Sequence, residues 1–419
     1  MKPYKQLLVS ILLLCGGGSV HSQSALFLLI SPSLTHNGMG GSGVSLPSSS
    51  AASTYYNPGA IAFLSEPGIN FSYQSSHTPW LPGLVDDMWI DYRASMIQIR
   101  LPLTSEQQLI QANTLSFCTS RTYLDAGLQQ YTGANGDDLG TFRTYFLSEN
   151  ASLSVGLSTR VFRIPVETGI GLTYKQIFQH LTSNQDGKAQ NTAFDWGFLS
   201  RTTLPLKMAQ HGIGGILEIS PSLGYSVSNI GAEVIFRSSE QADPLPRTAR
   251  FGVSLELNLM DSHLLYPMSF SVSRSAEDLL INQSASSWKY TKGLGDINFI
   301  NHVIRQSASD DVIVKSGWEL GIAETFWLRS GKYADLAGKV NYTTIGIEVA
   351  LIGIIPRDPG ATYEENSIAR LQHFVDLSYV YSSYVGISDF HPLHGTRFQG
   401  FELSVKHFDE LMGGISPKK

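Results

Sequence analysis

The chain has little of what would support a disulfide-stapled or highly charged soluble protein. Its 419 residues include only two cysteines, Cys15 and Cys118, and 15% of them are charged. Two cysteines, one of them near the N-terminus, provide no disulfide framework and no multi-cysteine metal site. The small charged fraction is poor for a soluble surface of this size. Stability must therefore come from packing and backbone pairing.

Basic surplus and long apolar runs are missing too. The net charge is −6, and lysine and arginine form no stripe, so no nucleic-acid partner is expected. Past the N-terminal region, no apolar run approaches the ~20 residues that a membrane-spanning helix needs. The sequence therefore argues against a helical membrane protein.

The motifs of nucleotide binding and nucleophilic catalysis are weak or absent. Gly38, Gly40 and Gly43 match the pattern G-x-G-x-x-G, but no convincing strand precedes them and no long helix follows. Neither G-x-S-x-G nor H-E-x-x-H occurs. We therefore expect no cofactor and no enzymatic activity, with a hydrolase built from separate strands as the remaining catalytic alternative.

One histidine cluster deserves a metal-site test. Asp389, His391 and His394 offer three potential ligands, but Pro392 interrupts any regular spacing and the segment lies in a predicted turn. We interpret it as a solvated loop and predict no metal site.

The N-terminus is typical of an export signal. Lys2 and Lys5 precede the apolar run 7–15, and small or modest residues follow up to Ser22. We predict a signal peptide over residues 1–22, cut after Ser22, which leaves Cys118 as the only cysteine. Lipidation at Cys15 is the alternative, but Leu14 stands where a lipobox needs a small residue.

The mature chain is dominated by a period of two. Residues 252–259 place Val253, Leu255, Leu257 and Leu259 on one face and Ser254, Glu256 and Asn258 on the other. Similar segments are 69–73, 97–101, 115–119, 151–158, 169–174, 194–198, 217–225, 268–272, 318–322, 342–351, 374–381 and 401–405, with a less regular one inside 282–305. They predict about fourteen strands, an even number as membrane barrels favour.

Three features favour a transmembrane barrel over a soluble β-sandwich. The polar face consists mainly of small residues, as a barrel lumen tolerates, and aromatic residues such as Trp89 with Tyr92 lie near strand ends. Short turns alternate with the longer polar stretches 129–142, 182–191, 283–311, 329–340 and 355–370. Pro221 predicts a locally unpaired or bulged strand. We predict an all-β, transmembrane antiparallel β-barrel over residues 66–408, in contact with the lipid of a bacterial outer membrane, and a tail over 409–419.

Residues 23–65 do not share this period. They are rich in serine and glycine, and Asn57-Pro58-Gly59 is a strong turn signal. Small residues let a segment lie close against a wall, so we predict a small N-terminal plug inside the barrel.

The plug residues carry a family resemblance. Gly38-Met-Gly40-Gly41-Ser-Gly43, followed by the turn Asn57-Pro58-Gly59, resembles the N-terminal signature of PorV/PorQ outer-membrane proteins, relatives of the FadL fatty-acid transporters. Stretches at 174–197, 244–253 and 395–404 are also similar to the family. Two departures are Gly59, where alanine is common, and Phe408, which lies off the parity of the last predicted strand.

The resemblance implies two functions of different class. PorV-like proteins act in type IX secretion, with secreted cargo proteins and secretion-machine components as partners. FadL-like proteins move hydrophobic small molecules, and a porin-like barrel is a third alternative. The long loops are mostly polar, as at 183–191, and the apolar stretch 80–85 is an exception. We therefore predict a PorV-like role in secretion or surface attachment, with FadL-like transport as the alternative.

Overall fold

The computed structural model describes most of the mature chain. The described residues are 24–48, 50–63, 67–101, 110–132, 135–162, 164–182, 187–210, 213–236, 242–261, 268–284, 287–355 and 367–411. The predicted signal peptide and the end of the predicted tail lie outside them. No helix among these residues is both long enough and apolar enough to cross a membrane.

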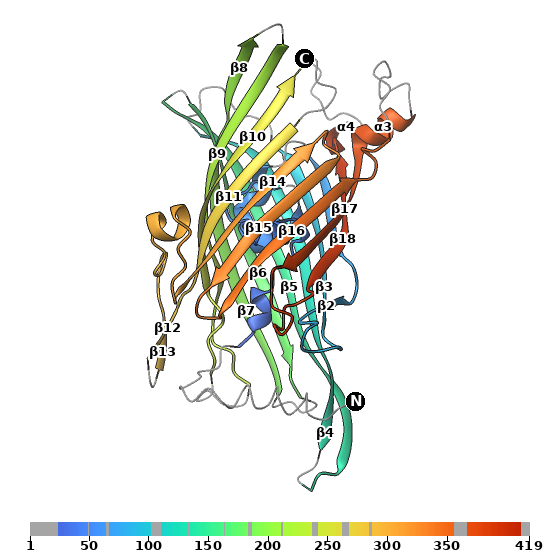
Figure 1. Ribbon diagram of the computed structural model, residues 1–419, viewed down its shortest axis with the longest axis vertical. Coiled ribbons are helices and arrows are strands. Elements are labelled where there is room, and N and C mark those ends of the chain that lie inside the picture. Colours follow the sequence, from blue (N-terminus) through green and yellow to red (C-terminus); the bar gives the residue numbers. More distant parts are fainter. Residues whose placement is uncertain are drawn as a thin grey trace.

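Fourteen antiparallel strands form one closed barrel (Figure 1). They are β1 (Gly68–Gln74), β3 (Trp89–Arg100), β4 (Ile110–Thr132), β5 (Asp138–Val161), β6 (Ile164–His180), β7 (Lys188–Thr202), β9 (Ile213–Gly231), β10 (Thr248–Asp261), β11 (Met268–Leu279), β14 (Val312–Ile322), β15 (Phe326–Asp335), β16 (Val340–Ala350), β17 (Val375–Val385) and β18 (Arg397–Lys406). Strand β1 pairs with both β3 and β18, which closes the sheet on itself. The predicted fold class and strand number are confirmed.

Four further short strands accompany the barrel. Strand β2 (Thr78–Pro79) pairs with β3, and β8 (Leu204–Gln210) continues the line of β7 along β9. Strands β12 (Ile281–Ser284) and β13 (Ser287–Tyr290) form a separate hairpin, drawn at the lower left of Figure 1.

The outer face of the wall is apolar and the inner face is small and polar. On β10, Leu255 is 41% exposed, whereas its neighbour Ser254 is 7% exposed. Across four strands, Ile97, Phe117, Leu153 and Leu172 are paired side by side and all are exposed. A closed barrel has no unpaired edge, so it can place such a belt in lipid. The fold is therefore that of a transmembrane β-barrel.

The two ends of the barrel differ in their connections. At one end β5 stops at Val161 and β6 begins at Ile164, and β14 stops at Ile322 and β15 begins at Phe326. At the other end, long connections join β9 to β10 and β11 to β14; the exceptions are the long β16–β17 connection at the first end and the short β15–β16 turn at the second. Outer-membrane barrels have short turns on the periplasmic side and longer loops outside. We therefore assign the lower end in Figure 1 to the cell surface.

Two sequence predictions about individual strands are wrong. Residues 329–340 were expected to be a loop, but most of them belong to β15. The irregular stretch inside 282–305 was expected to be a barrel strand, but it contains the β12–β13 hairpin and the π-helix η6 (Phe299–Ile304). This helix packs on the outer wall, where the ring of Phe299 lies 5.8 Å from that of Phe251. Its apolar residues cover the wall instead of extending it.

Pro221 interrupts pairing on one side of its strand only. Toward β10 the ladder is continuous and Pro221 pairs with Leu255. Toward the other neighbour, β7 pairs as far as Arg201 with Ser222, and β8 resumes with Leu204 opposite Ile219. Proline has no N–H to donate to a ladder. The predicted local unpairing therefore lies between β9 and the β7–β8 line.

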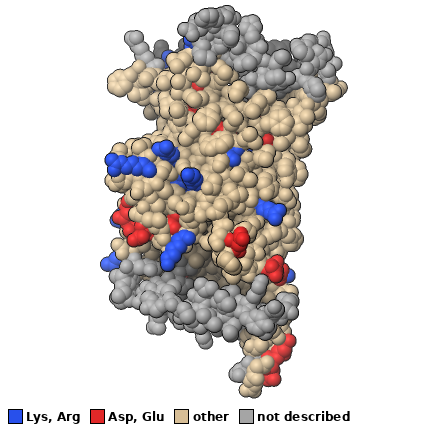
Figure 2. All heavy atoms as spheres, in the orientation of Figure 1, with Lys and Arg blue, Asp and Glu red and all other residues tan. Residues whose placement is uncertain are grey.

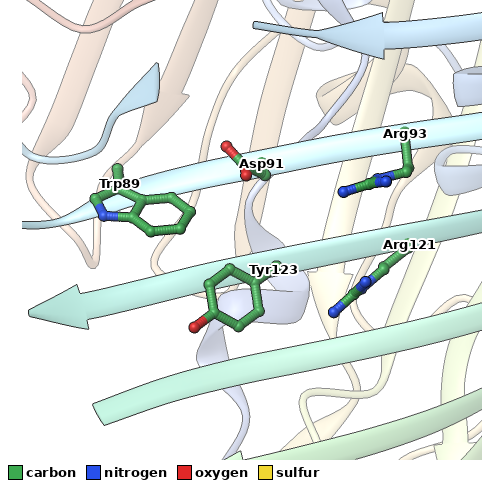
Figure 3. Close-up of a pocket in the computed structure, with 5 residues that line it drawn as sticks. All are labelled: Trp89, Asp91, Arg93, Arg121 and Tyr123. Atoms are coloured by element: carbon green, nitrogen blue, oxygen red, sulfur yellow. The ribbon is translucent and has the colours of Figure 1, made fainter. Parts of the chain in front are cut away.

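Aromatic side chains mark the cell-surface edge of the apolar belt. The ring centroids of Trp89 and Tyr123 are 5.3 Å apart, and Tyr145 lies 5.6 Å beyond Tyr123. Figure 3 shows Trp89 and Tyr123 beside Asp91, Arg93 and Arg121 around a hollow of about 200 Å³. On the face in Figure 2, charged side chains are few and lie mainly around mid-height and below it. Amphipathic rings and charges of this kind suit the membrane–water interface.

The sequence prediction grouped Tyr92 with this aromatic girdle, which is wrong for that residue. Tyr92 is 4% exposed and belongs to an inner cluster with Ile61 of the N-terminal segment. In a strand, successive side chains point to opposite faces. A residue within three positions of Trp89 can therefore lie on the other side of the wall.

Candidate functional site: the plug and its seat in the lumen

The N-terminal residues 24–63 lie inside the barrel, and we call this segment the plug. It contains the 3-10 helix η1 (Leu26–Leu29), the α-helix α2 (Leu34–Gly38) and the 3-10 helices η2 (Ala51–Tyr55) and η3 (Pro58–Phe63). Helix α2 contacts β15 to β18, η2 contacts β1, β3 and β4, and η3 contacts β4 to β7. In Figure 1 the plug is the dark blue chain seen within the wall. The plug thus contacts strands around the whole circumference.

The plug begins at the cell-surface end of the lumen. The Ser24 hydroxyl donates to the side-chain oxygen of Gln179, near the cell-surface end of β6. At the other end of the plug, the Arg201 guanidinium lies 5.3 Å from the Phe63 ring, near the periplasmic end of β7. The segment therefore runs along the lumen before it joins β1.

The glycine motif crosses the wall of β14 to β16 at close range. A Cβ placed on Gly38 would lie 3.0 Å from the Cα of Gly346, and one on Gly40 would lie 2.6 Å from the carbonyl oxygen of Lys332. The Thr344 hydroxyl donates to the Gly38 carbonyl (2.8 Å) and accepts from the Gly40 amide (2.9 Å). Gly40 also has a φ of 67°, which L side chains rarely adopt.

Gly41 and Gly43 shape the same turn from within the plug. Gly41 has a φ of 79°, and its amide donates to the His36 carbonyl at 2.8 Å. A Cβ on Gly43 would lie 2.5 Å from the ring of His36 and 2.8 Å from that of Tyr56. Packing, and not a nucleotide, therefore accounts for the G-x-G-x-x-G pattern.

The Asn57-Pro58-Gly59 turn is the second anchor. The Asn57 side-chain amide donates to the Val44 carbonyl within the plug and to the Phe198 carbonyl of β7, each at 2.8 Å. Its side-chain oxygen accepts from the Gly59 amide at 2.9 Å, as expected of an asparagine-stabilised turn. A Cβ on Gly59 would lie 2.5 Å from the Gly169 carbonyl oxygen. Glycine therefore fits here where the alanine of the resembling family would collide.

Paired wall glycines face the plug. Four cross-strand pairs in the barrel register consist of two glycines each: Gly171 with Gly197, Gly224 with Gly252, Gly317 with Gly331, and Gly156 with Gly169, which lies against Ala62 and Gly59 of the plug. The nearest plug residues are Pro58 and Asn57 at the first pair, Val44 at the second and Met39 at the third. These pairs remove side chains where the plug backbone reaches the wall. The sequence analysis did not identify them.

Serine and threonine hydroxyls of the wall bind the carbonyls of the plug. Ser222 and Ser254 both donate to the Ser45 carbonyl, at 2.6 and 2.9 Å. Other such donors are Ser273 to Ser42, Ser226 to Tyr56, Ser116 to Ile61 and Thr114 to Ala62. A buried backbone needs such partners. The small polar inner face is therefore matched to a peptide.

Two ion networks fill the polar lumen. Glu277 accepts from Arg250 (2.9 Å) and Lys315 (2.6 Å), and the Arg250 guanidinium lies 5.0 Å from the ring of Tyr55. Arg329 pairs with Glu319 and Glu348 on the strands to either side. Buried charges persist only when paired in this way. Both networks lie beside the plug, since a Cβ on Gly38 or Gly41 would touch Arg329 or Lys315.

His36 is buried between the glycine turn and the wall. Its Nδ1 lies 2.7 Å from the Ser33 hydroxyl, and its ring lies 5.1 Å from that of Tyr56. Burial first, and then the Arg329 guanidinium, lower the pKa of His36 to about 3. The docked plug therefore holds this imidazole neutral.

The cell-surface half of the lumen contains an apolar chamber. Phe27, Leu28, Ile30 and Leu34 of the plug form one buried cluster with Ile90, Leu124, Ile177, Val380 and Phe398 of the wall. Phe146 of β5 stacks on Phe27 at 5.5 Å, and Trp80 and Tyr384 pack on the same cluster. The wall residues come from five different strands. The first residues of the plug therefore fill an apolar space that the barrel itself builds.

The seven predicted motif residues lie at two places in this arrangement. Gly38, Gly40 and Gly41 lie against β14 to β16, Gly43 packs on His36 and Tyr56 within the plug, and Asn57, Pro58 and Gly59 lie against β6 and β7. Hydrogen bonding of Asn57 to the Val44 carbonyl ties the second place to the chain that leaves the first. The chamber was missed because its wall residues occur singly, at alternate positions of separate strands.

No protein-family model matches this chain, and no curated protein matches its sequence. Among solved structures, the chain is similar to the toluene transporter TodX of Pseudomonas putida, at 10% identity and a TM-score of 0.35 over 89% of this chain and 97% of that one. It is also similar to the toluene transporter TbuX of Ralstonia pickettii, at 10% identity and a TM-score of 0.33 over 88% and 95%.

A third similar structure is CdiB of Acinetobacter baumannii, at 10% identity and a TM-score of 0.35 over 82% of this chain and 60% of that one. At these TM-scores the likenesses carry no argument about what this chain binds. The resemblance to PorV and PorQ receives no confirmation from the comparisons and stays a prediction.

Proposed function

We propose that this barrel admits small hydrophobic molecules through the outer membrane, with the plug as its gate. The observation that carries the proposal is the apolar chamber near the cell-surface end, filled by Phe27 and Leu28 of the plug. A lumen for water and ions is polar. Apolar side chains on the inner face are therefore unexpected unless the lumen receives an apolar occupant.

The apolar plug residues in the chamber indicate the chemical class of solute that would bind there. Burial of apolar surface contributes about 25 cal/mol per Å², and Phe27 and Leu28 are 4% and 6% exposed. A hydrophobic solute that enters the chamber would replace these contacts with its own. It would thereby release the first turn of the plug from the wall.

The sequence analysis favoured secretion over transport because the long loops are mostly polar. It assumed that an apolar pocket would have to be formed by the loops, whereas the apolar residues lie on the inner face of the strands. Ile90, Leu124 and Ile177 face the lumen from strands, so the chamber does not depend on apolar loops. Within the described residues, no observation singles out a surface for exported cargo, and we carry transport as the proposed function.

The test measures binding and flux of an apolar probe. Toluene serves as the probe, with the purified barrel in detergent for binding and in proteoliposomes for flux. Ile177→Asn and Val380→Asn replace apolar side chains of the chamber by an amide. Each should weaken binding by about tenfold, the equivalent of 1.4 kcal/mol of lost apolar contact.

The matched control is Gln176→Asn, on the outward face of the same strand. It should bind toluene as the unaltered barrel does. The proposal fails if the unaltered barrel neither binds nor passes toluene, or if Ile177→Asn behaves like the control. Copurification of exported proteins with a tagged copy would instead support the secretion role.

A further inference from the structure

A histidine pair and a glutamate meet at the periplasmic end of the last two strands. Helix α3 (Ser367–Phe374) leads into β17, and helix α4 (Phe408–Leu411) follows β18. The final register pair of these strands is Val375 with Val405. His373 and His407 lie two positions beyond this pair, after Phe374 and Lys406, so the ends of the paired strands bring them to the same place on the rim.

The side chains of this cluster converge. His373 Nε2 lies 3.2 Å from Glu410 Oε2, and His407 Nδ1 lies 3.7 Å from Glu410 Oε1. One ligand atom from each of the three residues lies within 4.8 Å of the other two. The imidazole rings are stacked, 4.0 Å apart and 3° from parallel. His407 has a φ of 51°, an unfavourable backbone for a non-glycine residue.

Two changes would turn this cluster into a tetrahedral metal site: the ligand atoms, which lie within 4.8 Å of one another, must draw closer, and one of the parallel imidazole rings must rotate so that both nitrogens point at the same ion. Zinc binds histidine nitrogen and carboxylate oxygen at about 2.0–2.2 Å, which holds neighbouring ligand atoms about 3.4 Å apart. Two imidazoles and one carboxylate suit zinc and similar transition metals, whereas magnesium and calcium prefer oxygen ligands. We propose that His373, His407 and Glu410 bind one divalent transition-metal ion of the zinc type, with water in the fourth position.

The proposed ion would fasten the end of the chain. His373 belongs to the connection before β17, and Glu410 lies beyond the last strand. A metal that joins them would tie the connection before β17 to the residues that follow β18. This inference does not rest on the proposed transport function, because the site lies at the opposite end of the barrel from the apolar chamber.

The other histidine cluster provides a control within the same chain. Asp389, His391 and His394 lie in the β17–β18 connection at the cell-surface end. His394 Nδ1 is 3.6 Å from Asp389 Oδ1, but these side chains are 47% and 87% exposed. Among the described residues, the potential metal ligands that converge are His373, His407 and Glu410. The side chains of Asp389, His391 and His394 do not form such a group.

The experiment uses the full mature chain, purified in detergent without a polyhistidine tag. Co²⁺ is the probe, because tetrahedral Co²⁺ has a characteristic intense visible absorption, and Zn²⁺ is then added to displace it. We expect one Co²⁺ per chain with a tetrahedral spectrum, abolished by excess Zn²⁺. His373→Gln, His407→Gln and Glu410→Gln are the test variants, and His391→Gln with His394→Gln is the matched control.

Loss of an outer-shell partner alone costs about 10- to 100-fold in metal affinity, so each test variant should lose at least about 100-fold. The control should keep both stoichiometry and spectrum. Heat-modifiable migration checks that each variant is folded, and Glu410→Gln, on an exposed position, is the least disruptive. The proposal is overturned if the unaltered chain binds no stoichiometric Co²⁺, if binding survives in the test variants, or if it is lost in the control.

Discussion

Gly59 of the plug and Gly169 of β6 face each other with no room for a side chain between them. A Cβ on Gly59 would lie 2.5 Å from the Gly169 carbonyl oxygen, and a Cβ on Gly169 would collide with the Gly59 carbonyl oxygen. Two backbones meet here, so neither can retreat as a flexible side chain would. This contact fixes the depth at which the plug lies in the barrel.

Gly59→Ala should therefore displace the plug without unfolding the barrel. The added methyl would have to push the turn away from β6, which also stretches the bonds that Asn57 makes to Val44 and Phe198. Protease protection of residues 24–63 in the folded barrel measures the displacement. The control Ala60→Gly, at the adjacent position, adds no atom and should leave the plug protected from protease. Equal protection in both variants would contradict the close-packing account.

The outer belt predicts a different response on the two faces of β10. Leu255→Arg places a charge in lipid and should cost about 2–4 kcal/mol of barrel stability, whereas Val349→Arg, beside the end of β16, should cost less because the penalty falls toward the interface. Ser254→Arg should leave the strands paired but expel the plug, because Ser254 donates to the Ser45 carbonyl at 2.9 Å. Unfolding in denaturant and protease access to the plug separate these outcomes. Equal loss of barrel stability in Leu255→Arg and Ser254→Arg would overturn the inside–outside assignment.

His36 predicts that acid weakens plug docking. The docked imidazole has a pKa of about 3, whereas a released histidine has its ordinary value of 6.5. Because the released form takes up a proton first, docking is favoured fully above pH 6.5 and weakens as the pH falls from 6.5 toward 3. Protease access to the plug should rise over this window. His36→Gln should remove the histidine contribution, and an unchanged pH profile in this variant would exclude His36 as its source.

The sequence predicts a strand well when one of its faces is apolar and the other consists of small polar residues. On β10, leucines alternate with small polar residues, and the structure places Leu255 outside and Ser254 inside. Strand β15 was missed because its inner face carries Arg329, which makes the segment resemble a polar loop. Its charge is neutralised by Glu319 and Glu348 from neighbouring strands. Single-strand patterns cannot reveal such cross-strand pairing.

The residues of the candidate site also fall into two groups: those that the sequence indicates and those that only the structure reveals. The glycine motif and the Asn57-Pro58-Gly59 turn are local signals, and both occur in a segment that lies within the lumen. The wall glycines became meaningful only in register, as when Gly317 and Gly331 pair opposite Met39. The His373–His407 pair likewise depends on the register of β17 and β18. Long-range pairing decides these features, and sequence order does not show it.

The central claim is that residues 24–63 close the lumen of a barrel that stands without them. The strands pair around the circumference independently of the plug, so deletion of residues 24–60 should leave a folded barrel with a water path through it. A shorter deletion, 24–30, keeps both glycine-lined anchors and should remain nearly closed.

Planar-bilayer conductance measures this directly. The account predicts low conductance for the intact protein and for the 24–30 deletion, and large, steady channels for the 24–60 deletion. A 24–60 deletion that folds and conducts no better than the intact protein would contradict it.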